Sequence, residues 1–123
     1  MELTLKVLDQ ELSVCKVDEV SSEVYETQLY FIGRTDEELS LVCETRVAPA
    51  ESIAREDGWR AFRVEGVLDF SLTGILAKLS AVLADAGVGI FAVSTYNTDY
   101  ILVKERDMPH ALDSLHSAGY EIA

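Results

Sequence analysis

The second half of the sequence changes its hydrophobic period several times, and the order of these changes restricts the fold more than any other feature. Residues 72–86 place apolar side chains three and four positions apart, which is typical of one face of an amphipathic helix. Residues 108–118 repeat that spacing over a shorter length. Four other segments, rich in β-branched and aromatic residues, are expected to be strands: residues 59–66, 88–95, 100–104 and 120–123. This order of strand, helix, strand, strand, helix, strand predicts a ferredoxin-like α+β unit, with two helices on one face of a four-stranded antiparallel sheet.

Both predicted helices have residues at their ends that favour starting or stopping. Asp69 and Ser71 precede the first helix as candidate N-caps, and Gly87 is placed to end it in a left-handed turn. Asp107 is the candidate cap of the second helix, and Gly119 follows that helix. The end signals therefore agree with the hydrophobic periodicity.

The first half of the sequence is similar to the second half in weaker form. An offset of 61 residues places the turn 36–38 on the turn 97–99, and it places Gly58 on Gly119. With this offset a strand, a turn, a strand, a helix and a terminal glycine recur in register. Near the start of the chain the offset falls to about 50, which is expected if the long helix of the first half is reduced to a turn or two around residues 20–27. We therefore interpret the chain as a duplication.

The duplication predicts two tandem pseudo-repeats. The first, residues 1–58, is a shortened unit, and the second, residues 59–123, is complete. Residues 1–10 contain an additional strand, because Leu3, Leu5 and Val7 alternate with polar residues. Each unit is expected to have an antiparallel sheet with its helices on one face.

The charge balance excludes several classes of partner. The chain has 22 acidic and 10 basic residues, which gives a formal net charge of −12. Nucleic-acid binding requires a basic surface that replaces the counterions of phosphate groups, and an anionic membrane surface makes the same demand. No apolar run approaches the roughly 18 residues that would span a bilayer, and residues 1–4 lack the basic start of a secretion signal. We therefore expect a cytoplasmic protein that binds neither nucleic acid nor membrane.

Residues suited to catalysis or metal binding are few and scattered. Cys15 and Cys43 each lie in an apolar, strand-like run without metal-site spacing, so we expect two reduced core thiols. His110 and His116 are six positions apart on a helix, which places them on different faces. The sequence has no phosphate-binding loop and no nucleophile with an adjacent base. We predict that the chain is not an enzyme and has no catalytic residues, metal or cofactor.

The segment 66–74 is the first candidate binding site. It connects a buried strand to the start of the longer helix, where free backbone N–H groups and the positive end of the helix dipole favour a carboxylate. Gly74 allows a ligand to approach the backbone, and Asp69 has the charge to hold an ammonium group. The alternative is a capped loop without a ligand, in which Phe70 packs against the helix. On local physics alone, the capped loop is the commoner arrangement.

The segment 94–100 is the second candidate. Its hydroxyl, amide and carboxylate side chains at a strand end provide several hydrogen bonds for a zwitterion. The alternative is a hairpin turn in which Asn97 and Asp99 serve only the shape of the turn. The first half of the chain has Gly-Arg-Thr at residues 33–35 where the second half has Ser-Thr-Tyr. The polar strand end is therefore particular to the second half.

These two segments carry a resemblance to a known family. Residues 67–76 (VLDFSLTGIL) and 90–103 (IFAVSTYNTDYILV) look like an ACT domain, a βαββαβ module that senses small molecules. More narrowly, the chain is similar to double-ACT bacterial proteins that are related to the CASTOR arginine sensors and to the regulatory regions of aspartate kinases. The resemblance covers the second half throughout and the first half weakly.

The resemblance implies a regulatory, non-catalytic module that binds a small molecule, expected to be an amino acid. In this family the ligand lies between two ACT units, held by the loop before the first helix of one unit and the second strand of a neighbour. Carried over to this sequence, the implied ligand-binding residues are Asp69, Phe70, Ser71, Leu72, Thr73, Gly74, Ile75, Ala92, Val93, Ser94, Thr95 and Asp99. The first unit has no glycine-containing helix start after Lys16, which leaves a second, equivalent site without support.

Two other functions remain open. One is a protein-interaction module that binds no ligand, and the other is a regulatory subunit of an amino-acid biosynthetic enzyme. The strands around residues 91–93 and 101–103 are apolar on both faces, and helices can cover only one of them. The second face must therefore pack on the first unit or on another chain, and we expect a homodimer.

Overall fold

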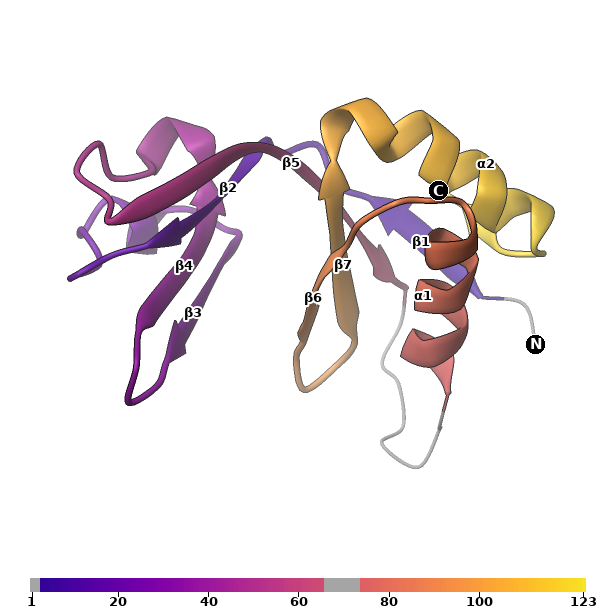
Figure 1. The fold of residues 1–123 in the computed structure, drawn as a ribbon, viewed down its shortest axis with the longest axis horizontal. Coiled ribbons are helices and arrows are strands. Elements are labelled where there is room, and N and C mark those ends of the chain that lie inside the picture. Colours follow the sequence, from indigo (N-terminus) through magenta and orange to yellow (C-terminus); the bar gives the residue numbers. More distant parts are fainter. Residues whose placement is uncertain (1–2, 66–73) are drawn as a thin grey trace. The chain divides into compact units, whose positions relative to one another are not determined.

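The computed structural model describes residues 3–65 and 74–123 (Figure 1). The chain forms two compact units: unit 1 comprises Met1–Asp9 and Arg60–Ala123, and unit 2 comprises Gln10–Trp59. Strand β5 (Ala54–Val64) contributes to both, because it runs through the division between Trp59 and Arg60. The predicted first domain, residues 1–58, differs from unit 2 by including residues 1–9 and by leaving out Trp59.

The sheet of unit 1 has the strand order β6-β7-β5-β1-β8. β1 (Thr4–Val7) pairs antiparallel with β5 and parallel with β8 (Glu121–Ile122). β6 (Phe91–Ser94) and β7 (Asp99–Lys104) form an antiparallel hairpin. The prediction of a four-stranded sheet is wrong, because the sheet has a fifth strand, β1, between β5 and β8. Leu5 of β1 is fully buried, so this additional strand contributes to the core.

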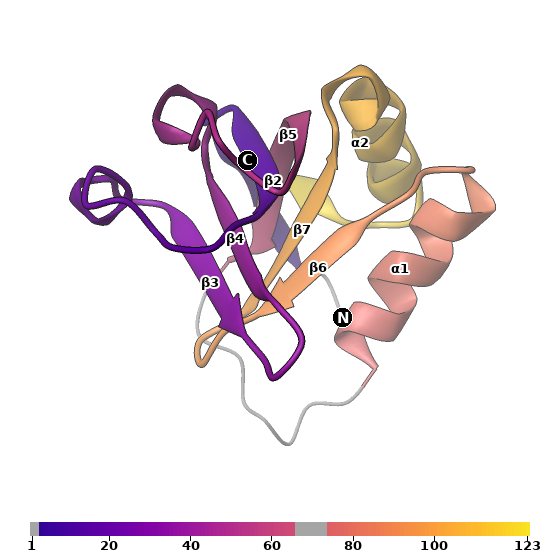
Figure 2. The same cartoon turned by 60° about the vertical axis from the view of Figure 1, so that its left-hand side comes forward.

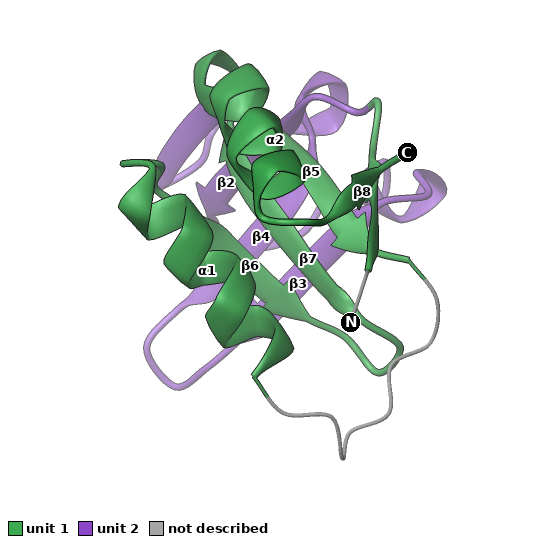
Figure 3. Ribbon diagram, turned by 90° about the vertical axis from the view of Figure 1, so that its right-hand side faces the viewer, with its two compact units in different colours: residues 1–9, 60–123 green, residues 10–59 purple. Residues whose placement is uncertain are grey.

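Two helices cover one face of the unit 1 sheet (Figure 3). They are α1 (Ile75–Asp85) and α2 (Met108–Ser117), and a short 3-10 turn, η3 (Glu105–Asp107), precedes α2. Both predicted helices are confirmed, although residues 72–73 lie outside the described residues. The helices and strands enclose one apolar core, formed by Leu5, Phe62, Val64, Ile75, Leu79, Leu83, Val88, Ile101, Val103, Met108, Ala111 and Leu115.

Both helices end at a left-handed glycine, which the sequence predicts for Gly87. Gly87 follows α1 with a φ of 76°, and Gly119 follows α2 with a φ of 102°. At the end of α1, the N–H of Gly87 donates to the carbonyl of Ala84 and the N–H of Val88 donates to the carbonyl of Leu83. These bonds satisfy carbonyls that the helix itself leaves without a donor.

The start of α1 differs from the prediction. Its N-cap is Gly74, with a φ of 81°, instead of Asp69 or Ser71. The periodicity continues through residues 72–73 and does not mark the point at which the helix begins. Helix boundaries are set by backbone conformation, which an apolar pattern determines only loosely.

Unit 2 has the strand order β3-β4-β2-β5. Its strands are β2 (Leu12–Lys16), β3 (Tyr30–Arg34), β4 (Leu39–Glu44) and the first half of β5. A smaller apolar core contains Cys15, Val17, Val24, Leu41 and Cys43.

Two 3-10 turns lie between strands of unit 2. The first, η1 (Val24–Glu26), lies within the region 20–27 where a shortened helix is predicted. The second, η2 (Thr45–Val47), follows β4. The sequence predicts that the second helix recurs in this half before Gly58. That prediction is wrong, because residues 54–59 form the first half of β5.

β5 begins five residues earlier than the predicted strand 59–66. Its first half pairs with β2, and the register shifts by one residue between the pairs Leu12↔Trp59 and Val14↔Glu56. The extra residue forms a bulge beside Gly58, whose φ of 83° suits glycine. A glycine and several charges in this region concealed the strand from a composition-based prediction.

Figure 2 shows the β3–β4 hairpin of unit 2 and the β6–β7 hairpin of unit 1. Their pairings match each other at an offset of 60. The last pair before the turn is Arg34↔Leu39 in one hairpin and Ser94↔Asp99 in the other. The predicted offset of 61 is wrong by one residue for the hairpins. A slip of one residue moves every side chain to the other face of a strand, so the offset decides which residues correspond.

Within residues 3–65 and 74–123, the structure contains no helix with the length and apolar character that crossing a membrane would require.

Candidate functional site

The structure describes seven of the twelve predicted ligand-binding residues. Asp69, Phe70, Ser71, Leu72 and Thr73 lie outside the described residues. The other seven belong to unit 1 and lie at the start of α1 or in the β6–β7 hairpin: Gly74, Ile75, Ala92, Val93, Ser94, Thr95 and Asp99.

Only some of these residues share a face of the sheet. Asp99 alternates with Ile101 along β7, and Ile101 packs in the core beneath the helices. Cross-strand pairing places Ser94 opposite Asp99 and Ala92 opposite Ile101, so these residues are on the helix-covered face. Val93 is on the opposite face, because successive residues of a strand alternate. Ile75 is 9% exposed and packs in the core, which leaves its backbone as the part available to a ligand.

Ser94 and Asp99 form the most directly linked polar pair among the predicted residues. The Ser94 hydroxyl donates a 2.6 Å hydrogen bond to Oδ1 of Asp99. The two residues are cross-strand partners at the end of the hairpin, so the bond orients the carboxylate toward the helix-covered face. This arrangement provides a negative charge of defined orientation at the edge of that face.

Thr95 has a structural role in the turn. Its hydroxyl donates to the carbonyl of Thr98 at 2.8 Å, and its N–H donates to the same carbonyl at 2.9 Å. The Thr98 N–H in turn donates to the Thr95 hydroxyl at 3.3 Å. Thr35 and Glu38 form the same kind of turn in unit 2, with an N–H to carbonyl distance of 2.9 Å. The Thr95 hydroxyl is therefore engaged within the protein.

Sequence reasoning missed a basic residue on the other face of the sheet. Arg63 lies between the buried residues Phe62 and Val64, so its side chain points away from the helices. Its guanidinium contacts the Tyr100 hydroxyl at 3.5 Å and the Glu65 carboxylate at 3.4 Å. The contact with Tyr100, and then the one with Glu65, raises the pKa of Arg63. The alternation within the predicted strand 59–66 is the signal that could have identified it.

The first turn of α1 has backbone donors without acceptors inside the helix. Among the described residues, the first helical bond at this end runs from the Lys78 N–H to the Gly74 carbonyl, at 2.9 Å. The N–H groups of Ile75, Leu76 and Ala77 consequently have no partner within α1. Because the helix dipole adds positive potential here, this end of α1 favours a negatively charged group.

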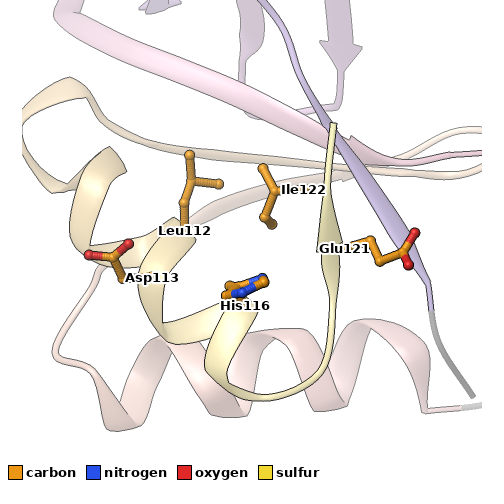
Figure 4. A pocket seen from close by; sticks show the side chains of 5 residues that line it. All are labelled: Leu112, Asp113, His116, Glu121 and Ile122. Carbon is orange, nitrogen blue, oxygen red and sulfur yellow. The ribbon is translucent and has the colours of Figure 1, made fainter.

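Two cavities lie away from the predicted residues. One, in unit 1, has a volume of about 530 Å³ and is lined by Leu112, Asp113, His116, Glu121 and Ile122 (Figure 4). The other, in unit 2, has a volume of about 280 Å³ and is lined by Lys16, Val17, Asp18, Arg34, Thr35, Asp36, Glu37, Glu38, Leu39 and Ile53. Neither cavity is lined by any of the seven predicted residues that the structure describes.

The two cysteines are free, buried thiols in the core of unit 2. Burial, and then the neighbouring Cys15 thiol, raises the pKa of Cys43 to about 12. Burial also raises the pKa of Cys15. Among the residues that the structure describes, no three His, Cys, Asp or Glu side chains are grouped in a way that could hold a metal ion.

Comparison with known families settles what kind of domain this is. The family model described as ACT domain matches residues 54–117, which are 64 of the 123 residues. The chain belongs to the ACT domain family. The match includes the second half of the predicted duplication up to the end of α2, and it includes the segment 66–74 that first suggested a binding site.

Individual relatives give this ACT domain protein a narrower context. It is 44% identical over 46 residues to the human protein CASTOR3P, a match that covers 37% of this chain and 28% of that protein. Its fold is similar to protein Atu0741 from Agobacterium tumefaciens, with a TM-score of 0.91, 29% identity, and coverage of 100% and 93% of the two chains. It is also similar to the regulatory subunit of aspartate kinase from Thermus thermophilus, with a TM-score of 0.64, 12% identity, and coverage of 93% and 95%. The last similarity concerns the fold alone.

Proposed function

We propose that this ACT domain protein is a regulatory module that binds an amino acid between the start of α1 and the end of β6, without catalysing a reaction. Family membership supports a regulatory, ligand-binding role. The single observation that carries the proposed site is the Ser94–Asp99 pair, which orients a carboxylate on the sheet face that α1 covers. The fold similarity to a regulatory subunit of aspartate kinase is consistent with this role.

The proposed site separates the two charges of an amino acid. The ligand carboxylate meets the N–H groups of Ile75, Leu76 and Ala77, where the helix dipole favours an anion. The ligand ammonium is balanced by Asp99, and by Asp69 from the segment outside the described residues. In such a site the backbone receives the carboxylate, which suits a chain with only 10 basic residues.

The remaining predicted residues complete the proposed site. Phe70, Ser71, Leu72 and Thr73 would form the loop, Gly74 would allow the ligand to approach, and Ala92 and Ser94 would form the strand wall. Val93 points to the opposite face, and the Thr95 hydroxyl is engaged in the turn, so these two residues would take part through their backbone. Binding would favour one arrangement of the chain and thereby alter a surface that a regulated protein reads.

Calorimetry with each of the twenty amino acids tests this proposal. We expect one or a few to bind the wild-type chain and to bind Asp99→Asn at least about tenfold more weakly, because the charge is lost while the shape is kept. Asp36→Asn is the matched control, since Asp36 is an exposed carboxylate in the corresponding turn of unit 2. Absence of binding at about 5 mM of every amino acid, or equal binding by both variants, would contradict the proposed site.

A cytoplasmic homodimer remains part of the proposal. The apolar character of the central strands is its motivation. Light scattering at micromolar protein is expected to give twice the mass of the chain, and a monomeric mass would reject the dimer. The ligand-free interaction module and the regulatory subunit of a biosynthetic enzyme remain alternatives. Calorimetry distinguishes the interaction module from a sensor, because only a sensor binds an amino acid.

A further inference from the structure

The cavity between α2 and β8 is a groove whose chemistry differs from that of the proposed ligand site. We call it the α2–β8 groove, lined by Leu112, Asp113, His116, Glu121 and Ile122. Figure 4 shows Leu112 and Ile122 facing each other across the gap between the helix and the strand, with His116 beside them. The carboxylates of Asp113 and Glu121 point outward on the two sides. The groove therefore has an apolar centre between two negative charges.

The groove lies at one edge of the unit 1 sheet. β8 is the last strand in the strand order, with β1 as its neighbour. The N–H groups of Glu121 and Ala123 donate to the carbonyls of Leu3 and Leu5, at 3.0 and 2.8 Å. In a parallel pair alternate residues bond to the neighbouring strand, so the N–H and C=O of Ile122 point away from β1. Among the described residues no strand pairs with β8 on that side, so this edge can accept another strand.

The lining residues support an edge location. Glu121 and Ile122 are consecutive in β8, so their side chains point to opposite faces of the sheet. Both residues line the cavity, and β8 is at the end of the strand order, so the cavity lies at this edge of the sheet. An added strand would therefore lie beside β8 and within reach of Leu112 and His116 on α2.

The charges restrict the occupant. Both permanently charged residues of the groove are acidic, and no lysine or arginine lines it. The whole chain carries a net charge of −12, which disfavours a second copy of this chain as the occupant. Nucleic acids and anionic membranes are disfavoured for the same reason. An extended protein segment with basic residues around an aliphatic one matches both the centre and the rim of the groove.

We propose that the α2–β8 groove binds an extended basic segment of a partner protein, which adds to β8 as a further strand. An aliphatic side chain of the segment packs between Leu112 and Ile122, and its lysine or arginine side chains lie near Asp113 and Glu121. The backbone of the segment bonds to the N–H and C=O of Ile122, which point away from β1. This surface goes beyond the proposed amino-acid site and uses none of its residues.

Titration of the ¹⁵N-labelled full chain with short peptides tests the proposal by NMR. The probe is Ac-KTKIKTK-NH2, and its two controls are Ac-ETEIETE-NH2, with the charges reversed, and Ac-KTKSKTK-NH2, without the aliphatic residue. We expect the basic probe to shift the signals of residues 112–122 and to bind with a Kd below about 1 mM. Both control peptides should bind at least about tenfold more weakly. Hydrogen exchange of the Ile122 N–H should slow when the basic probe is bound.

A pair of matched variants tests the role of the charges. Asp113→Lys with Glu121→Lys reverses both charges of the groove, and Asp36→Lys with Glu37→Lys makes the same change in net charge on exposed residues of unit 2. We expect the first double variant to lose at least about tenfold in affinity and the second to lose much less. All four substituted residues are exposed, so both proteins should fold.

Several results would overturn the proposal. They are equal binding of the acidic and basic peptides, equal affinity of the two double variants, and no shifts at about 2 mM peptide. Butylammonium binding as tightly as the peptide would instead assign the groove to small amines and would also overturn it. The titration is made without any amino acid, so its failure leaves the proposed amino-acid site intact, and failure of that site leaves this result intact.

Discussion

The hydroxyl of Thr98 donates a 2.7 Å hydrogen bond to the backbone carbonyl of Val64. This bond joins the turn of the β6–β7 hairpin to the end of β5, in the part of unit 1 where Ser94 and Asp99 lie. Thr98 is 7% exposed, although the rest of the turn is polar and mostly open to solvent. The orientation of the hairpin end therefore depends on a buried hydroxyl.

Replacing Thr98 with valine should destabilise unit 1. The variant keeps the shape of the side chain but leaves the Val64 carbonyl without this donor, which costs about 1–3 kcal/mol for a buried group. Urea denaturation followed by circular dichroism measures the change. Thr98→Ser, which keeps the hydroxyl, should recover most of the loss. Equal stability of the valine variant and the wild type would show that the bond contributes nothing.

Two glycines that are two residues apart should differ in their response to alanine. Gly87 has a φ of 76°, so Gly87→Ala places a side chain in the left-handed region and should cost about 1 kcal/mol. Gly89 has no positive φ, and a methyl group there would meet nothing within 4 Å. Gly89→Ala should be neutral or stabilising, by up to about 1 kcal/mol, because it restricts the unfolded chain. Thermal unfolding of both variants tests the contrast, and similar losses would contradict it.

Alkaline pH should weaken unit 2 through Cys43. Burial, and then the adjacent Cys15 thiol, raises the pKa of Cys43 from 9.0 to about 12. Between these two values the unfolded chain binds fewer protons than the folded chain, so the free energy of unfolding falls as the pH rises. The contribution is fully present below pH 9 and is lost as the pH approaches 12.

Comparison with Cys43→Ala isolates that contribution. The variant should be less stable at pH 8, because it leaves a cavity in the core. From pH 8 to pH 10 its free energy of unfolding should fall by about 1 kcal/mol less than that of the wild type. Urea denaturation at both pH values gives the two slopes, and parallel slopes would exclude the thiol as their cause.

Two arginines should differ in their effect on stability. Nε and Nη2 of Arg60 donate to the Leu8 carbonyl at 3.2 and 2.8 Å, in a partly buried site. Arg60→Met keeps much of the apolar stem and should cost about 1–2 kcal/mol. Arg46 forms an ion pair with Glu44 at 3.2 Å, but its side chain is 69% exposed. Arg46→Met should therefore change the free energy of unfolding by less than about 0.5 kcal/mol, and equal losses in the two variants would contradict this ranking.

The elements of unit 1 could be predicted because their signals are local. The stripe of apolar residues in α1 and the glycine that ends each helix require no knowledge of the rest of the chain. The placement of β1 between β5 and β8 could not be predicted in this way, because it depends on pairings with Val64 and Ile122, which are distant in sequence. Alternation within a strand indicates which side chains are buried, but it does not identify the neighbouring strand.

The offset between the hairpins shows a different limit. Leu41 and Leu102 are identical residues at an offset of 61, which favours aligning them. Yet Leu41 corresponds structurally to Ile101, since these two residues hold the same position in their hairpins and both pack in a core. A shift of one residue changes which polar residues correspond. In the structural alignment, at an offset of 60, Ser94 corresponds to Arg34 and Thr95 corresponds to Thr35. The two binding segments could be predicted from the sequence. The side chains within them that face α1 could be identified only from the strand pairing in the structure.

The position of β1 also affects how the chain can fold as it is made. Leu5 is synthesised before both of its cross-strand partners, Val64 and Ile122. Unit 2 is one continuous segment, so its strands can pair before β1 has paired with β5 and β8. Long-range pairing of this kind slows folding, because the chain must close large loops before it gains the contacts. β1 therefore leaves the ribosome before both of its neighbours and pairs only after they have followed, and a fragment that begins at Arg60 would lack the strand that separates β5 from β8.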